Sequence, residues 1–265
     1  MNTVRYARYI IKDGVTCYEN LDDHLSLAAF VASLLYIKIF GFRYDKEVLL
    51  YVALAGLLHD IAKALNVYHR LLPRGRLSFS NPPHEEVSAA IARTMILESR
   101  VRICKVLGKD VDIERLEKLV IRPISNHHQG LRMLTLEERS SISYNLKKDD
   151  VIAINNVIKS SINKLLGYVE RFSPYIPEDL IKLTKRIPDL GLELKNSRLR
   201  RSIRIDMGAG EANVEDQISL SELSRIVTGI LIAADYIATE VNLLKINSRC
   251  LSSTRLSREI LNLTR

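Results

Sequence analysis

The stretch from residue 45 to residue 65 constrains the fold most strongly, because it is apolar nearly all round. A helix without a polar face has to be surrounded by other elements, so the stretch predicts a central, buried helix. His59 and Asp60 stand towards its end, in the segment GLLHDIAKA. A buried imidazole and carboxylate need partners, because an unpaired buried charge is strongly unfavourable. The pair is therefore either hydrogen-bonded within the core or part of a functional site.

The rest of the chain predicts a short hairpin followed by helices. Asp13-Gly14 between two β-rich runs favours a tight turn, so a hairpin is expected at about 6–19. Gly108 is expected to end one helix, and Pro123 to kink or end another. The residues from Arg70 to Pro83 hold three prolines and predict a loop. Helices are expected over 21–40, 84–107, from 112, 149–169, 177–185 and 216–246.

Length and composition favour one mainly α domain. The 265 residues are 47% hydrophobic and 26% charged, which suits a globule with a sizeable core. No internal repeat or linker divides the chain, so we expect a single helical-bundle domain over 1–265 with a short N-terminal β-hairpin. Residues from about 140 to 215 match no motif, and 150–215 is a possible family-specific insertion.

Charge and cysteine content limit partners and compartment. Lysine and arginine number 39 against 31 acids, a net charge of +8, which favours an anionic partner. Three cysteines without a CxxC motif exclude a disulfide framework or a thiolate zinc site. No signal core stands at the N-terminus and no apolar run approaches the ~18 residues of a membrane span, so a cytoplasmic protein without a membrane partner is expected.

The histidines stand in distinctive settings. Asp235 interrupts the apolar run TGILIAADYIAT, where a carboxylate needs a cation or several donors unless it reaches solvent. We expect His69 to be an ordinary surface residue. The remaining histidines and acids follow one order along the chain: His24, His59-Asp60, His84, His127-His128 and Asp235.

This order resembles the HD superfamily of metal-dependent phosphohydrolases, whose signature is H…HD…D on a bundle of helices. The chain is most similar to the stand-alone archaeal HD nuclease of type I CRISPR interference. The matching segments are YENLDDHL, AGLLHDIAKA, SFSNPPHEEVSA, the NHHQ pair and LIAADYIAT. Ala62 and Pro83 replace glycines that are frequent in the family, and neither replacement removes a ligand.

The resemblance implies two divalent metal ions that share Asp60. It assigns one ion to His24, His59, Asp60 and Asp235, and the other to Asp60 together with His84, His127 and His128. Such ions attract an anionic phosphodiester and activate water, so no protein nucleophile is needed. Five nitrogen ligands favour manganese, cobalt, nickel, iron or zinc over magnesium, without identifying the ion.

Catalytic and binding residues beyond these ligands are also expected. Asp60 is the central catalytic residue, and Lys63, on the same helical face, is expected to contact the scissile phosphate unless its ammonium merely reaches solvent. Two basic runs, 70–76 and 195–204, could contact a nucleic-acid backbone; either could instead be a solvated surface, which explains 195–204 at least as well. The candidate arginines are Arg70, Arg74, Arg76, Arg198, Arg200 and Arg201.

We therefore expect a metal-dependent nuclease that hydrolyses single-stranded DNA in CRISPR interference. The resemblance implies a separate helicase subunit and an RNA-guided surveillance complex as partners, and the chain lacks a GxxxxGK[ST] phosphate loop of its own. One alternative is an HD phosphohydrolase acting on nucleotides, either a dNTPase or a cyclic-nucleotide phosphodiesterase. Another is a catalytically silent HD-fold subunit that binds nucleic acid or protein.

Overall fold

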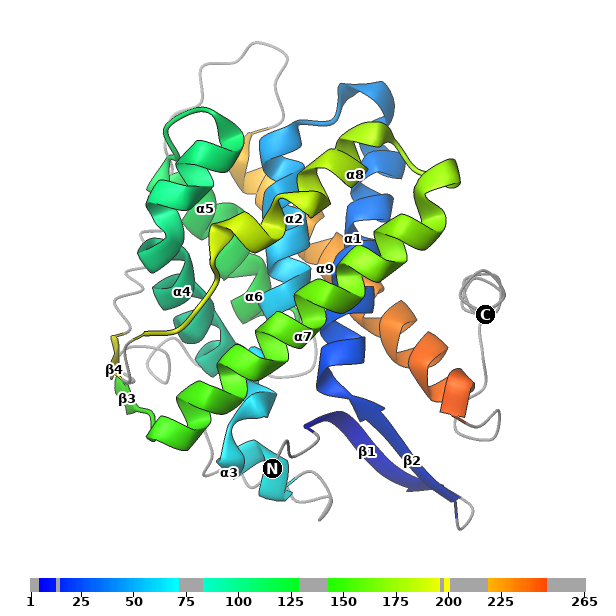
Figure 1. Cartoon of the computed structure of the whole chain (residues 1–265), viewed down its shortest axis with the longest axis vertical. Coiled ribbons are helices and arrows are strands. Elements are labelled where there is room, and N and C mark those ends of the chain that lie inside the picture. The colour runs from blue at the N-terminus through cyan, green and yellow to red at the C-terminus, as the bar shows by residue number, and fades with distance from the viewer. Residues whose placement is uncertain are drawn as a thin grey trace.

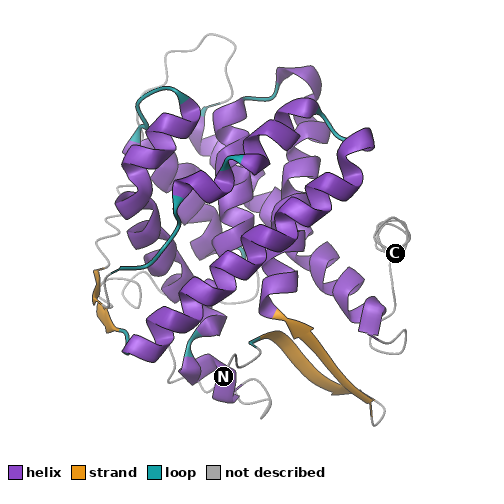
Figure 2. Cartoon of the chain, viewed as in Figure 1, coloured by secondary structure: helices purple, strands orange, loops and turns teal. Residues whose placement is uncertain are grey.

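The N-terminal hairpin of the sequence prediction is present. The computed structural model describes residues 5–12, 15–71, 83–128, 143–195, 198–200 and 219–246. It is mainly helical, and β1 (Tyr6–Lys12) pairs antiparallel with β2 (Val15–Asn20) beside the helices (Figures 1 and 2). The predicted turn at Asp13-Gly14 lies outside the described residues. Strand β2 continues directly into α1 (Leu21–Phe40), so the hairpin is anchored at the start of the first helix.

Helix α2 (Lys46–Leu58) is the predicted central helix, and every residue from Glu47 to Leu58 is buried. Asp45 caps it by accepting a hydrogen bond from the backbone N–H of Glu47 at 2.8 Å. The helix passes very close to α1, because a Cβ built on Gly56 would lie 2.5 Å from Ala29 Cα. Only glycine allows this approach.

The prediction of one helix over 45–65 is wrong at its C-terminal end. The α-helix stops at Leu58, His59 and Asp60 form a turn, and a 3₁₀ helix follows over Ile61–Ala64. Asp60 leaves the helical region, with φ −113° and ψ 14°. The His59-Asp60 pair therefore lies at the end of the buried helix, where side chains can turn towards neighbouring elements.

The other helices enclose α2, and their bounds follow the predicted pattern closely. Helices α9 and α7 both pack against α1, and α7 crosses the front of the bundle in Figure 1. Gly108, with φ 70°, ends α4 as predicted. The helices are α3 (Asn66–Leu71), α4 (His84–Leu107), α5 (Ile113–Leu116), α6 (Arg122–Asn126), α7 (Lys148–Phe172), α8 (Glu178–Lys185) and α9 (Leu220–Ile246). Short 3₁₀ turns lie at Gly41–Arg43, Ser173–Tyr175 and Ile187–Leu190.

Three other boundaries differ from the prediction. Helix α3 runs to Leu71, so the loop expected from Arg70 begins later. Pro123 does not end its helix: a π-helical segment, Glu117–Ile121, precedes it, and the chain stays helical to Asn126. A π turn is wider than an α turn and leaves room for the proline ring, which would otherwise crowd a carbonyl of the preceding turn. Of the helix expected from 216, the described part begins at Leu220.

A second small sheet was not predicted. Strand β3 (Ser143–Asn145) pairs antiparallel with β4 (Arg198–Arg200) and joins the two sides of the segment that contains α7 and α8. Residues such as Ile154, Leu165 and Leu180 from these helices belong to the same hydrophobic core as α1 and α2. The described part of 150–215 therefore packs as an integral part of the bundle.

Two further observations bear on the expectations about compartment. Helices Leu21–Phe40 and Leu220–Leu243 are long and apolar enough to cross a membrane, but 61% and 56% of their apolar windows are buried inside the protein, as in the core helices of soluble proteins. The absence of a membrane span thus stays a prediction. Cys17 is disulfide-bonded, whereas Cys104 is free.

Candidate metal centre

The predicted ligand residues converge beside the C-terminal end of α2. His24 comes from α1, His59 and Asp60 from the turn after α2, and Asp235 from α9. Their ligand atoms lie within 4.8 Å of one another, and we call this set the inner group. The outer group meets the same criterion and consists of Asp60, His84 at the start of α4, and His127 and His128 after α6. Each group could hold a metal ion.

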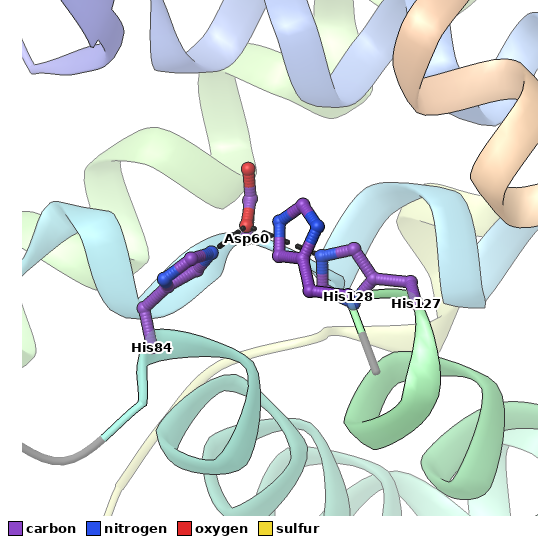
Figure 3. Close-up of side chains that lie close together, drawn as sticks. All are labelled: Asp60, His84, His127 and His128. Carbon is purple, nitrogen blue, oxygen red and sulfur yellow. Dashed lines mark ion pairs between the residues drawn. The ribbon is translucent and has the colours of Figure 1, made fainter. Parts of the chain in front are cut away.

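Asp60 belongs to both groups and turns a different oxygen to each. Its Oδ2 lies 3.5 Å from His24 Nε2 and 3.7 Å from His59 Nε2. Its Oδ1 lies 3.1 Å from His84 Nε2 and 3.6 Å from His127 Nε2. Figure 3 shows His84 and the His127-His128 pair approaching Asp60 from opposite sides. The carboxylate is thus placed as a bridge between the groups.

The inner group is closed to solvent, whereas the outer group is partly open. His24, His59, Asp60 and Asp235 are all buried. His24 Nε2 lies 3.0 Å from His59 Nε2 and 3.2 Å from Asp235 Oδ1. In the outer group His84 and His127 are buried, but His128 is only half-buried. Among the described residues, the outer group is thus the more exposed of the two, through His128.

Hydrogen bonds at Nδ1 fix the orientation of the imidazoles. The Nδ1 of His59 donates to the carbonyl of Gly56 at 2.9 Å, and the Nδ1 of His127 donates to that of Ile124 at 2.6 Å. Both carbonyls lie in the last turn of a helix, where backbone acceptors lack intrahelical partners. Each histidine thus donates from Nδ1 to a carbonyl at the end of a helix, and its Nε2 faces the centre.

The carboxylates of the centre are held in their charged form. Burial opposes ionisation of Asp60, but Lys63 and His59 hold its pKa well below the ordinary value. Burial also opposes ionisation of Asp235, and His24 and His59 lower its pKa strongly. Both groups are therefore anionic, as ligands for a cation need to be.

The imidazoles differ in their affinity for protons. Burial disfavours the charged form of His24, but Glu19, Asp235 and Asp60 raise its pKa well above the ordinary value. Burial lowers the pKa of His59, and burial with the neighbouring His127 lowers the pKa of His128 to about 3. His128 is thus neutral over the physiological range and able to ligate.

Three ligand atoms of the outer group lack the hydrogen bonds expected of buried polar atoms. Asp60 Oδ1, His84 Nε2 and His127 Nε2 are buried, and within the part of the chain that the structure describes they have no hydrogen-bond partner apart from one another. Buried polar atoms are nearly always satisfied, so each exception needs an explanation. Imidazole and carboxylate atoms that converge in this way suit a divalent transition metal.

Lys63 lies against the bridging carboxylate rather than in solvent. Its Nζ is 2.5 Å from Asp60 Oδ2, and its side chain is 14% exposed. It reaches this position from the 3₁₀ helix and not, as predicted, from a continuous α-helix. Its expected contact with a phosphate stays a prediction.

Sequence reasoning missed two residues of the centre. Glu19 accepts a hydrogen bond from His24 Nδ1 at 2.9 Å, and Asn242 of α9 donates to the same Glu19 oxygen at 2.8 Å. The alternation of β2 held a signal, since Glu19 and Cys17 share its buried face.

The basic residues expected to contact nucleic acid stay untested by the structure. Arg74, Arg76 and Arg201 lie outside the described residues. Arg70 lies in α3, and Arg198 and Arg200 in β4, but only their backbones are described. His69, expected at the surface, is half-buried, and its ring stacks on Tyr6 with centroids 5.8 Å apart.

Comparisons with family models, with curated proteins and with solved structures give no match for this chain.

Proposed function

We propose that the chain is a metal-dependent phosphohydrolase of the HD superfamily that hydrolyses phosphodiester bonds of single-stranded DNA. One observation carries the proposal: two groups of buried imidazoles and carboxylates share Asp60, which turns one oxygen to each. A carboxylate in that position suits two neighbouring divalent ions, which is the arrangement of many phosphodiester-cleaving sites.

The donors fit such ions. Five imidazoles and two carboxylates favour manganese, cobalt, nickel, iron or zinc over magnesium, and the three unsatisfied outer-group atoms point towards a shared position. When bound, two divalent ions supply an acid that neutralises a phosphate and a means of activating water.

The protein's own residues prepare the centre for this chemistry. The inner group is buried and holds its imidazoles by backbone and side-chain hydrogen bonds, so its geometry is set before a substrate arrives. Lys63 places a positive charge beside Asp60, where it offsets negative charge that a phosphate brings. The half-buried His128 marks the side from which the substrate enters.

The nucleic-acid substrate rests on the resemblance described above and on charge. A net charge of +8 agrees with a polyanionic partner but does not select one. We accordingly propose a cytoplasmic nuclease of CRISPR interference that acts on a strand supplied by a separate helicase subunit and an RNA-guided complex.

The test compares labelled single-stranded DNA, double-stranded DNA and free deoxynucleoside triphosphates as substrates for the purified protein across a panel of divalent metals. Metal-dependent cleavage of the single strand is expected, with loss in Asp60→Ala and retention in Asp189→Ala, an exposed carboxylate far from the centre in sequence. Hydrolysis of nucleotides with intact DNA would favour the nucleotide phosphohydrolase instead. Cleavage by Asp60→Ala would overturn the metal assignment.

A further inference from the structure

We propose that Glu19 of the N-terminal hairpin is a positioning residue of the metal centre, and that Asn242 holds it in place. The inference rests on the proposed function in one respect: it takes the inner group to bind a metal ion. It adds that β2 and the far end of α9 hold His24 in the orientation that metal binding needs.

The geometry of His24 gives Glu19 this role. Glu19 Oε1 accepts from His24 Nδ1 at 2.9 Å, which directs His24 Nε2 to within 3.2 Å of Asp235 Oδ1. Among the inner-group histidines, His59 takes its orientation from a backbone carbonyl of its own helix. His24 lies in the first turn of α1, where the backbone groups left without intrahelical partners are N–H donors and not carbonyls, and a side chain from another element supplies the acceptor.

Glu19 is itself fixed from a distant part of the chain. It is 1% exposed, and Asn242 Nδ2 donates to the same Oε1 at 2.8 Å from 223 positions away. Asn242 stands seven residues after Asp235, so both lie on one face of α9. One face of α9 therefore carries both Asp235, a member of the inner group, and Asn242, which holds Glu19 in place.

Charge also links Glu19 to a bound cation. Glu19, Asp60 and Asp235 are buried carboxylates, and Lys63 is the one ammonium that the structure places in contact with any of them within the described residues. Buried carboxylates persist only where positive charge and hydrogen bonds compensate them. A carboxylate behind a histidine also makes that histidine a stronger ligand.

The experiment follows binding of Co²⁺ to the metal-free protein by its visible absorption, which responds to the ligands around the ion independently of catalysis. We expect Glu19→Ala to weaken one binding event about 10- to 100-fold. Glu19→Gln keeps an acceptor for His24 but loses the charge, so an intermediate loss of about 10-fold is expected. The matched control is Glu47→Gln, a buried carboxylate at the opposite end of α2, which leaves Co²⁺ affinity unchanged.

A second measurement shows whether Glu19 acts through His24. In a His24→Ala background, adding Glu19→Ala is expected to cause no further loss of affinity, because the side chain that it orients is already absent. Additive losses would overturn the proposal, as would wild-type affinity in Glu19→Ala. Where Glu19→Ala fails to fold, Glu19→Gln carries the test, and wild-type affinity there overturns the proposal equally.

The outcomes separate this inference from the proposed function. A wild-type protein that binds Co²⁺ and cleaves single-stranded DNA, with a Glu19 variant of equal affinity, refutes the positioning role alone. A wild-type protein that binds no Co²⁺ refutes the metal centre and the positioning role together.

Discussion

The substitution Gly56→Ala tests whether the close approach of α1 and α2 sets the geometry of the inner group. An added Cβ would lie 2.5 Å from Ala29 Cα and 2.8 Å from Ala29 N. Both atoms are backbone and cannot rotate away. Carbon atoms pack at about 3.5–4.0 Å, so the helices have to separate by about 1 Å.

Two opposing terms set the effect on stability. Overpacking of this kind costs about 1–3 kcal/mol, whereas replacing glycine by alanine within a helix gains up to about 1 kcal/mol. We expect a net loss of about 1 kcal/mol in the free energy of unfolding. The matched control is Gly229→Ala in α9, which is exposed with nothing within 4 Å of the added Cβ, and which should gain about 0.5–1 kcal/mol.

The same separation should disturb metal binding. His24 lies one turn before Ala29 and His59 lies just after Gly56, so moving the helices apart lengthens the 3.0 Å distance between the two Nε2 atoms. Ligand distances in metal sites tolerate changes of about 0.2 Å, so affinity should fall about tenfold or more. Urea unfolding in the presence of a chelator and Co²⁺ titration provide the two measurements. If Gly56→Ala matched the control in both, the argument from helix approach would be refuted.

The remaining predictions concern charge and metal. Burial opposes ionisation of Glu47, but contacts with Lys109 and Tyr51 hold the pKa of its carboxyl below the ordinary 4.5. The ionised Glu47 therefore stabilises the protein above pH 4.5, and this stabilisation is lost as the pH falls through and below 4.5. Glu47→Gln should therefore lower the free energy of unfolding at pH 7 by about 1–2 kcal/mol and by much less at pH 3, measured by urea unfolding at both values; an equal loss at both would contradict the assignment. Lys63→Met should lower the free energy of unfolding by about 3 kcal/mol in the presence of a chelator, because it leaves Asp60 buried without its ammonium partner. Mn²⁺ should reduce this difference between variant and wild type. An unchanged free energy of unfolding in the chelator would show that the ion pair is not needed. Mn²⁺ at 100 times its Kd should stabilise the wild-type protein by about 2.7 kcal/mol relative to the chelated form, and an unchanged thermal midpoint would argue against a metal site.

Most of the helices could be predicted because their sequence signals are local. Gly108 ends α4, and apolar residues mark α1 and most of α2, so the bounds of α1 and α4 and the start of α2 needed no knowledge of the tertiary structure. The predicted ligands were also marked locally, since a charged or titratable side chain in an apolar helix demands a partner. The structure brings together all of the residues that were proposed to share the two sites.

The features that escaped prediction depend on contacts between distant parts of the chain. Pairing of β3 with β4 joins residues about 55 positions apart, and neither strand has a marked alternation over three residues. The role of Glu19 depends on Asn242, which no local pattern connects to it. The early end of α2 follows from side-chain contacts of His59 and Asp60 that favour a turn where the apolar pattern continues.

The inner group draws its ligands from both ends of the described chain, at position 24 in α1 and position 235 in α9. During synthesis from the N-terminus, an incomplete chain already contains His24, His59 and Asp60 but has no Asp235 to complete the set. The set of four candidate ligands is thus complete only after α9 docks. The proposed centre, in which Asp60 joins both groups, is therefore complete only when the last described helix has been made.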